Sequence, residues 1–502
     1  MLTIKDNCCL FSCLVLMGLS FFVMEGAAGQ KQRDLFKAKT YYLDQSGNDN
    51  NSGSRQMPWK TISKLNTVKL GPGDTVCLKA GQVFTGTLRL EKIIAGNASR
   101  PIVITSYGKG KAIINGDTAA AVSLYQVKYI VVSNLLLTGA GRKDGNRESG
   151  IAVLNSDHIK LERLNVSGFQ KAGVLVYQSG YVTVDHVNAH DNGYAGISIE
   201  GGYGERETTH DIDIRGCNAI NNPGDPTNTT NHSGNGIVAG YCKKLTIEYC
   251  TATNNGWDMP RTGNGPVGIW AYEADSVLIR YCISYRNKTS KGSSDGGGFD
   301  LDGGVTNSTI QYCLSYENEG SAFGIFQYAG ASGWHNNHIQ YNISVNDGLV
   351  STAKANVFIW NSSRDQKQFT GCYFEHNIIY NSKGAAISYD KESEQEGFQF
   401  YDNLFVAKDD LIIGWQWGKG SKFLGNTWWS ITSGFNIEGI KDINVWARQY
   451  MQEQRNGTIA GINKNPGLKD LEKTTLKDPY QLKEFLKILW GRTGMTTKKK
   501  MI

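Results

Sequence analysis

This sequence of 502 residues lacks a long internal apolar run, a metal-binding Cys pattern and a strong charge excess, and each absence argues against a class of protein. No apolar run long enough to cross a bilayer follows residue 30, which predicts a chain without a membrane span. No CxxC pair or Cys/His cluster is present, so a zinc site is not expected. The formal charge of +6 is diffuse, which argues against nucleic acid as a partner but would favour an acidic polymer.

The first 28 residues have the pattern of a signal peptide. Lys5 is followed by an apolar run over residues 10–23 and then by the small residues 26–29. This order predicts export and cleavage near Ala28 or Gly29. The run is short for a bilayer, so a retained membrane anchor is the weaker alternative. We expect a secreted or periplasmic protein that is monomeric.

The middle of the chain repeats an irregular unit of roughly twenty to forty residues. Each unit begins with a Gly and a short apolar strand, as at residues 196–199 and 268–271. A polar turn, a second short strand and an Asn-rich corner follow. Short strands at such a period, with no helical pattern between them, predict an all-β, right-handed parallel β-helix over residues 41–435. Residues 436–502 are expected to form a C-terminal cap, with short helices at 444–454 and 478–490.

Cysteine and asparagine recur in register with this repeat. In each of four coils an Asn lies five residues after a Cys, and Cys372 and Asn377 repeat the spacing. We expect the Cys column to pack inside and the Asn column to bond along the stack at a turn. Seven Cys follow the signal peptide, and a packing register favours free buried thiols over disulfides. The four pairs are Cys217/Asn222, Cys250/Asn255, Cys282/Asn287 and Cys313/Asn318.

The N-terminal coils resemble a known superfamily. An extended Tyr-Leu strand is followed by Ser-Gly-Asn at 46–48, Pro-Trp-Lys-Thr-Ile at 58–62 and Gly-Pro-Gly-Asp-Thr at 71–75. This order is similar to that of secreted β-helix proteins of the pectate-lyase-like superfamily, and the resemblance covers residues 41–435. It implies the fold but leaves the reaction open among lyases, hydrolases, epimerases and adhesins. The motif set of polygalacturonases and the Arg signature of family 1 pectate lyases are absent, while residues 297–300 loosely resemble calcium-dependent β-helix lyases.

Side-chain alternation predicts a ligand-binding stripe along the first strand of each coil. With the residue after each Gly placed inside, the carboxylates Asp300 and Asp302 point outward together. Aromatic pairs occupy the coils before and after them, and exposed aromatic rings in a row indicate a binding surface suited to sugars. The substrate-binding candidates are Trp270, Tyr272, Phe326, Tyr328, Glu200 and Trp360, with Phe358, Asp390, Trp415 and Trp417 farther along.

Asp300 and Asp302 are the candidate catalytic residues. Two neighbouring carboxyls tend to have different pKa values, which suits an acid and a base in glycoside hydrolysis. A calcium site and a solvated surface pair are the alternatives. Asp295, Glu273 and Glu317 are nearby carboxylates. The loops 256–265 and 286–296, with Arg261, Arg286 and Lys291, are expected to form one wall of the cleft.

The expected function is that of an exported carbohydrate-active enzyme. The first hypothesis is a glycoside hydrolase that cleaves a polysaccharide, acidic ones included, with no cofactor and no metal. The second is a polysaccharide lyase assisted by Ca²⁺, which would yield an unsaturated product. The third is a non-catalytic solenoid that binds or adheres to glycans.

Overall fold

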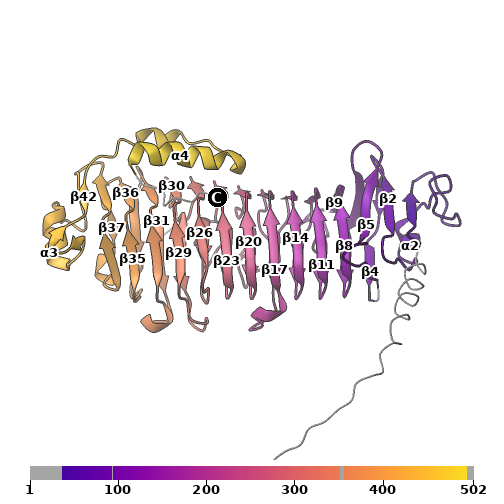
Figure 1. Cartoon of the computed structure of the whole chain (residues 1–502), viewed down its shortest axis with the longest axis horizontal. Helices are drawn as coiled ribbons and strands as arrows, with labels where there is room; N and C mark the ends of the chain where they lie inside the picture. The colour runs from indigo at the N-terminus through magenta and orange to yellow at the C-terminus, as the bar shows by residue number, and fades with distance from the viewer. Residues whose placement is uncertain (1–36, 93, 351–354, 495–502) are drawn as a thin grey trace, which may run out of the picture.

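The computed structural model describes residues 37–92, 94–350 and 355–494, which form one long right-handed parallel β-helix (Figure 1). The expected signal peptide, its cleavage site and the C-terminal Lys498–Lys500 run lie outside the described residues. The expected all-β solenoid is confirmed. Within the described part of the chain, no helix is long and apolar enough to cross a membrane.

Three parallel sheets form the sides of the solenoid. The lateral sheet has fourteen strands, from β1 (Thr40–Leu43) to β38 (Ser421–Leu424). The site sheet has twelve, from β4 (Leu88–Glu91) to β37 (Ile412–Ile413). The third sheet has fourteen, from β3 (Val83–Thr85) to β42 (Ile462–Asn463). Each complete turn of the chain contributes one strand to each sheet, so neighbouring coils pair strand by strand, while the turns at the two ends contribute fewer strands.

Alternating side chains fill the interior of the solenoid. In β16 (Ala195–Glu200), β19 (Asn235–Gly240), β22 (Val267–Tyr272) and β25 (Gly297–Leu301) the residue after the Gly is completely buried. Burying each such side chain contributes roughly 1.5–3 kcal/mol. This fixes which side chains of the same strands point outward, as the sequence predicted. The inward residues are Ile197, Ile237, Ile269 and Phe299.

The expected register is wrong by two residues at β28 (Phe323–Gln327). Phe299 pairs with Phe323 rather than with Ile325, so Asp300 lies opposite Gly324. Phe326 therefore pairs with Trp360 of β31 (Ala355–Asn361), whereas the expected register aligned it with Phe358. Both Phe323 and Ile325 are apolar and inward, and an alternating pattern cannot distinguish a shift of two residues.

The Asn ladder is present and the cysteines are free. Asn222, Asn255, Asn287 and Asn318 are buried, and each amide donates to the next one along the stack at 2.9 Å, the last donating to Asp347 at 2.7 Å. All seven described Cys are buried free thiols. The prediction for Cys372 and Asn377 is wrong, because Cys372 pairs with Asn337 within the lateral sheet.

Asn377 instead belongs to a second ladder. It accepts from the Asn342 amide at 3.0 Å and donates to Asn403 at 3.1 Å. The backbone N–H of Cys313 donates to Asn342, so this ladder continues the Cys column rather than the first Asn column. The same Cys-to-Asn spacing thus arises in two different places of the coil.

Both expected C-terminal helices are present. α3 (Ile443–Tyr450) lies at the end of the solenoid, where Trp446 is fully buried against the last coils. α4 (Leu482–Thr493) turns back along the outer face of the third sheet (Figure 1). Its Leu486 and Trp490 pack with residues of that face. α4 therefore covers a side of the solenoid, whereas α3 closes its C-terminal end. The short α2 (Ile62–Leu65) lies among the first coils.

Candidate functional site

A cavity of about 850 Å³ lies on the outer face of the site sheet. Its floor is formed by β22, β25, β28 and β31, and its lining extends from Tyr203, in the connection after β16, to Asp390, just after β34 (Ala385–Tyr389). The strands β16 and β34 are separated by six coil spacings of about 4.8 Å, so the lining is roughly 29 Å long. A cavity of this volume accommodates a small ligand or a few sugar units.

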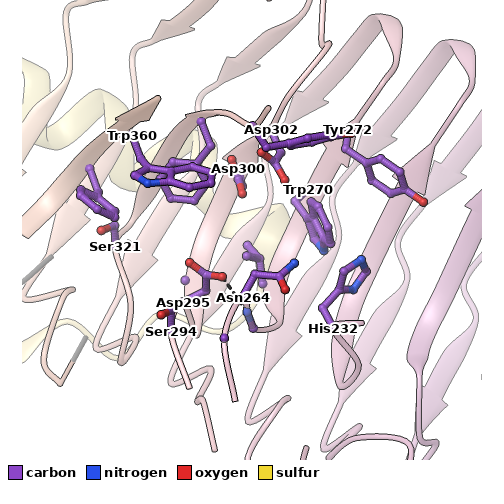
Figure 2. Close-up of a pocket in the computed structure, with 18 of the residues that line it drawn as sticks. His232, Asn264, Trp270, Tyr272, Ser294, Asp295, Asp300, Asp302, Ser321 and Trp360 are labelled. Atoms are coloured by element: carbon purple, nitrogen blue, oxygen red, sulfur yellow. Dashed lines mark hydrogen bonds between the residues drawn. The ribbon is translucent and has the colours of Figure 1, made fainter. Parts of the chain in front are cut away.

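Three carboxyls reach this cavity from one coil. Asp300 lies on β25, Asp302 follows the end of that strand, and Asp295 lies in the loop that precedes it. Figure 2 shows all three in the same hollow, with Trp360 to one side and Trp270 to the other. The expected pair Asp300/Asp302 is thus joined by Asp295, which the sequence offered only as a nearby carboxylate.

The three carboxyls differ in exposure and in hydrogen bonding. Asp300 is only 2% exposed, and its Oδ1 has no hydrogen-bond partner among the described residues. Asp295 and Asp302 are partly open to the cavity. Asp295 Oδ2 accepts the Gly265 N–H at 2.7 Å, and Asp302 Oδ1 accepts the Gly303 N–H at 2.7 Å.

Burial raises the pKa of each carboxyl, and repulsion from neighbouring carboxylates raises the pKa of Asp300 and Asp302 further. Burial is the largest cause in all three. It raises the pKa of Asp295 to about 6, even though the Gly265 N–H and Arg261 favour the ionised form. The pKa of Asp302 rises to about 7, because the charges of Asp295 and Glu273 add to burial. The pKa of Asp300 lies well above its usual range, because burial is reinforced by the charges of Asp302 and Asp295.

Aromatic side chains line both ends of the cavity. The N-terminal lobe, made of Tyr203, Tyr241, Trp270 and Tyr272, is a continuous run of rings with neighbouring centroids 5.4–5.7 Å apart. The C-terminal lobe, made of Phe326, Phe358 and Trp360, has edge-to-face contacts at 5.4 and 6.1 Å. Trp270 and Phe326 are outward but buried, at 4% and 9% exposure, so the expected open stripe is a walled cavity.

Hydrogen bonds fix the polar ends of the N-terminal rings. Trp270 Nε1 donates to Asn235 Oδ1 at 3.1 Å. The Asn235 amide in turn donates to Nδ1 of His232, at 3.0 Å. Burial and nearby Arg261 lower the pKa of His232 to about 4. His232 is therefore neutral near pH 7, and the ring lies against Trp270 on the cavity wall (Figure 2).

Glu200 does not line the cavity, contrary to its expected role in binding substrate directly. Its Oε2 accepts the Tyr272 hydroxyl at 2.8 Å and its Oε1 accepts the Ser198 hydroxyl at 3.0 Å. Burial raises its pKa to about 7 against the effect of these donors. Glu200 holds the Tyr272 ring from behind, so its influence on a ligand acts through that ring.

The predicted loop wall is present. Residues 261, 263–265 and 294–295 line the cavity, so loops 256–265 and 286–296 do form one side. Of the expected loop cations, only Arg261 reaches the cavity. Arg286 pairs with Glu317 at 2.8 Å outside it, and Lys291 is exposed elsewhere.

Two expected aromatic positions lie elsewhere. Trp415 is buried in the core against Phe423 and Trp446, because the chain leaves the strand pattern at a short 3₁₀ turn over Trp415–Trp417. Trp417 packs against the same core and does not line the cavity. Tyr328 does line the cavity, but from the turn after β28 rather than from the strand. Asp390 lines the far end, as expected.

Sequence reasoning missed His232, Tyr203 and Ser321 of this cavity. All three lie in connections between strands, where the repeat gives no register. Ser321 is buried, and its hydroxyl has no hydrogen-bond partner among the described residues. The one available signal was the length of the connection that holds His232, which is longer than the corner of the preceding coil. The described part of the chain contains no group of three His, Cys, Asp or Glu side chains placed to hold a metal ion.

Comparisons with known proteins place the chain among β-helix proteins. Residues 41–356 match the family described as the Pel9A-like, right-handed beta helix region. A lacto-N-biosidase of Bifidobacterium longum subsp. longum is 24% identical over a match covering 78% of this chain and 30% of that protein. The native GH136 lacto-N-biosidase from Eubacterium ramulus has a TM-score of 0.54 at 17% identity, covering 82% of this chain and 68% of that one. The chain thus spans less than a third of the Bifidobacterium protein.

Proposed function

The chain belongs to the Pel9A-like right-handed β-helix family, and from this premise we propose that it is a glycoside hydrolase acting on a largely neutral glycan. The observation that carries the proposal is the cluster of three carboxyls with raised pKa values between two aromatic lobes. Glycoside hydrolysis needs a protonated and an ionised carboxyl beside the same bond. Aromatic rings supply apolar faces for sugar rings on both sides of that bond.

Asp302 is the proposed general acid and Asp295 the proposed base or nucleophile. Between pH 6 and 7 the Asp302 carboxyl keeps its proton, because its pKa is about 7. The Asp295 carboxyl, with a pKa of about 6, has already lost its proton there. Both are partly open to the cavity, so both can contact a substrate. The cluster titrates as a unit, so these two values describe the coupled set.

Asp300 has a different proposed role. It is almost fully buried, and burial together with the charges of Asp302 and Asp295 raises its pKa well above the usual range, which favours its neutral form. A neutral carboxyl between two others avoids a third negative charge on the same coil. That Asp300 itself contacts the sugar stays a prediction, which the turnover and substrate affinity of an Asp300→Asn variant would test.

The charge inside the cavity favours a hydrolase over a lyase. A lyase acting on a uronate must neutralise the substrate carboxylate and supply a base for the proton beside it. The cavity instead presents Asp295, Asp300, Asp302 and Asp390, with Arg261 as the only Lys or Arg lining it among the described residues. With one cation against four carboxyls among the described lining residues, the cavity offers little to neutralise the carboxylates of an acidic polymer, although the whole chain is basic. The names of the two relatives support the same choice, since both are lacto-N-biosidases and one is assigned to GH136.

The test combines a substrate panel with variants of the cluster. The wild-type protein is incubated with aryl lacto-N-bioside, neutral oligosaccharides and uronic acid polymers, while reducing ends and ultraviolet absorbance are followed. We expect release from a neutral glycan without new absorbance. Absorbance from a uronate polymer would instead identify a lyase, and binding without release would identify a glycan-binding protein.

Asp→Asn variants then assign the roles. Asp295→Asn and Asp302→Asn should each lower kcat by roughly 100-fold or more, as expected for loss of a general acid or base. Azide should restore turnover only when Asp295 is replaced by Ala. A substrate with an activated leaving group should restore it mainly in Asp302→Asn. Asp213→Asn, on the lateral sheet away from the cavity, is the matched control.

We further propose that the protein is exported and works as a monomer without a metal. The support for export is the pattern of residues 1–29. N-terminal sequencing of the mature protein tests the cleavage site near Ala28, and sedimentation tests the oligomeric state.

A further inference from the structure

We propose that Arg206 and Glu273 are positioning residues that hold the Asp302 loop, residues 302–304, in place at the edge of the cavity. The inference rests on the proposed function and goes beyond it, because neither residue needs to contact the substrate. It follows from a set of hydrogen bonds that joins segments far apart in the sequence.

Arg206 ties three segments together. It lies in the short 3₁₀ turn Arg206–Thr208, which follows β16. Its Nη2 donates to Glu273 Oε2 at 2.5 Å and to the carbonyl oxygen of Gly304 at 2.7 Å. Glu273 is 67 residues away in the chain and Gly304 is 98 residues away. The side chains of Arg206 and Glu273 are only 23% and 6% exposed, so water weakens this ion pair little.

Glu273 and its neighbours hold the Asp302 loop from the other side. The backbone N–H of Glu273 donates to the carbonyl oxygen of Gly303 at 2.7 Å. The Gly304 N–H donates to Oε1 of the buried Gln327 at 3.1 Å. Ser332 links these residues, because its N–H donates to Glu273 Oε1 at 2.8 Å and its carbonyl accepts from the Gln327 amide at 2.9 Å. Arg206, Glu273, Gln327 and Ser332 together are called the frame of the loop below. The carbonyl of Gly303 and both the N–H and the carbonyl of Gly304 therefore have fixed partners.

The backbone of the loop is shaped to fit this frame. Gly304 has φ +75°, and a Cβ there would lie 2.4 Å from Glu273 Oε2. A larger residue could not approach the carboxylate so closely. Because Asp302 accepts from the Gly303 N–H within the same loop, displacement of the loop would move the proposed acid.

The frame also sets the charge beside Asp302. Glu273 and Asp295 face it with negative charge, Asp300 is a further carboxyl beside it, and Tyr328 contributes a hydroxyl. Arg206 offsets the charge of Glu273 through their ion pair. Removing Glu273 should therefore lower the pKa of Asp302, whereas removing Arg206 should raise it. A merely structural ion pair would not shift the pH profile in opposite directions in its two variants.

The experiment compares Glu273→Gln and Arg206→Gln with Glu248→Gln as the matched control. Glu248 of β20 (Lys243–Glu248) forms a similar ion pair with Arg280 at 2.7 Å, on the lateral sheet. We expect kcat to fall roughly 10- to 100-fold in both test variants with little change in KM, as for a misplaced catalytic group. The alkaline limb of the pH profile should move down by about one unit in Glu273→Gln and up in Arg206→Gln. An unchanged profile, or shifts in the same direction, would overturn the proposal.

Hydrogen exchange separates this inference from the proposed function. Peptides covering residues 302–306 should exchange faster in both test variants than in the wild type and in Glu248→Gln. This measurement needs no substrate, so a wild-type protein without hydrolytic activity would refute the function and leave the frame testable. Unchanged protection of residues 302–306 in both variants would refute the frame, whatever the activity.

Discussion

Replacing Asn255 by Ala should destabilise the solenoid beside the cavity. The Asn255 amide donates to Asn287 Oδ1 at 2.9 Å and to the Ala219 carbonyl at 3.0 Å, while its Oδ1 accepts from the N–H and the amide of Asn222, both at 2.9 Å. Alanine leaves the Asn222 N–H and the Ala219 carbonyl without these partners. A buried unsatisfied group costs roughly 1–3 kcal/mol, so the expected loss is about 2–6 kcal/mol.

Local hydrogen exchange is the suitable assay, because solenoids can unfold regionally rather than in one step. Peptides covering residues 219–222 and 252–256 should lose protection, and the melting temperature should fall. Asn218→Ala is the matched control, since Asn218 of β18 (Asn218–Ile220) is half-buried and lies outside the ladder. If Asn255→Ala and Asn218→Ala lost the same small amount of protection, the ladder would not stabilise the corner as argued.

Four further predictions concern the cavity. The pH profile of kcat should be bell-shaped with its maximum between about 6 and 7, because activity needs Asp295 ionised and Asp302 protonated; a profile rising steadily to pH 9 would contradict these roles. Tyr203→Ala should raise KM for longer glycans and leave short aryl glycosides unaffected, because Tyr203 is 91% exposed at the distal end of the N-terminal lobe; equal effects on both would contradict a distal platform. Gly324→Ala should reduce kcat while the protein stays folded by circular dichroism, because the added Cβ would lie 2.8 Å from the Phe326 ring and 2.9 Å from Asp300 Cγ; an unchanged kcat would show that the ring and the carboxyl both move without cost to turnover. Chelation with EDTA should leave hydrolysis unchanged, and a loss restored by Ca²⁺ would support the lyase hypothesis.

The fold and the site coil were predictable because they depend on periodicity. Alternation along strands placed Ile269 inside and Trp270 outside, and the Asn spacing identified a turn ladder that the structure contains. The shift at β28 was not predictable, because Phe323 and Ile325 satisfy the same alternating pattern. Asp295 was underrated for a related reason, since it lies in a connection and the repeat carries no information on where a loop turns.

The cavity walls show the same limit. Contacts such as that between Arg206 and Glu273 join coils through side chains of loops, and no period in the sequence connects them. Long-range pairs of this kind depend on the backbone path of each connection. The sequence therefore predicted the floor of the site better than its walls.

Glycines on the outer face explain why the rings of the cavity lie along the solenoid. At Gly240 an added Cβ would lie 2.1–2.5 Å from the Tyr272 ring, so this ring covers the glycine of the preceding coil. At Gly303 it would lie 2.4 Å from the Tyr328 ring. Neighbouring coils are about 4.8 Å apart. Because a glycine has no side chain, an aromatic ring from the next coil can reach over this spacing and lie flat on the backbone of the glycine. The platforms are therefore set by pairs of coils, a glycine on one and an aromatic residue on the next, and changing either member would remove the platform.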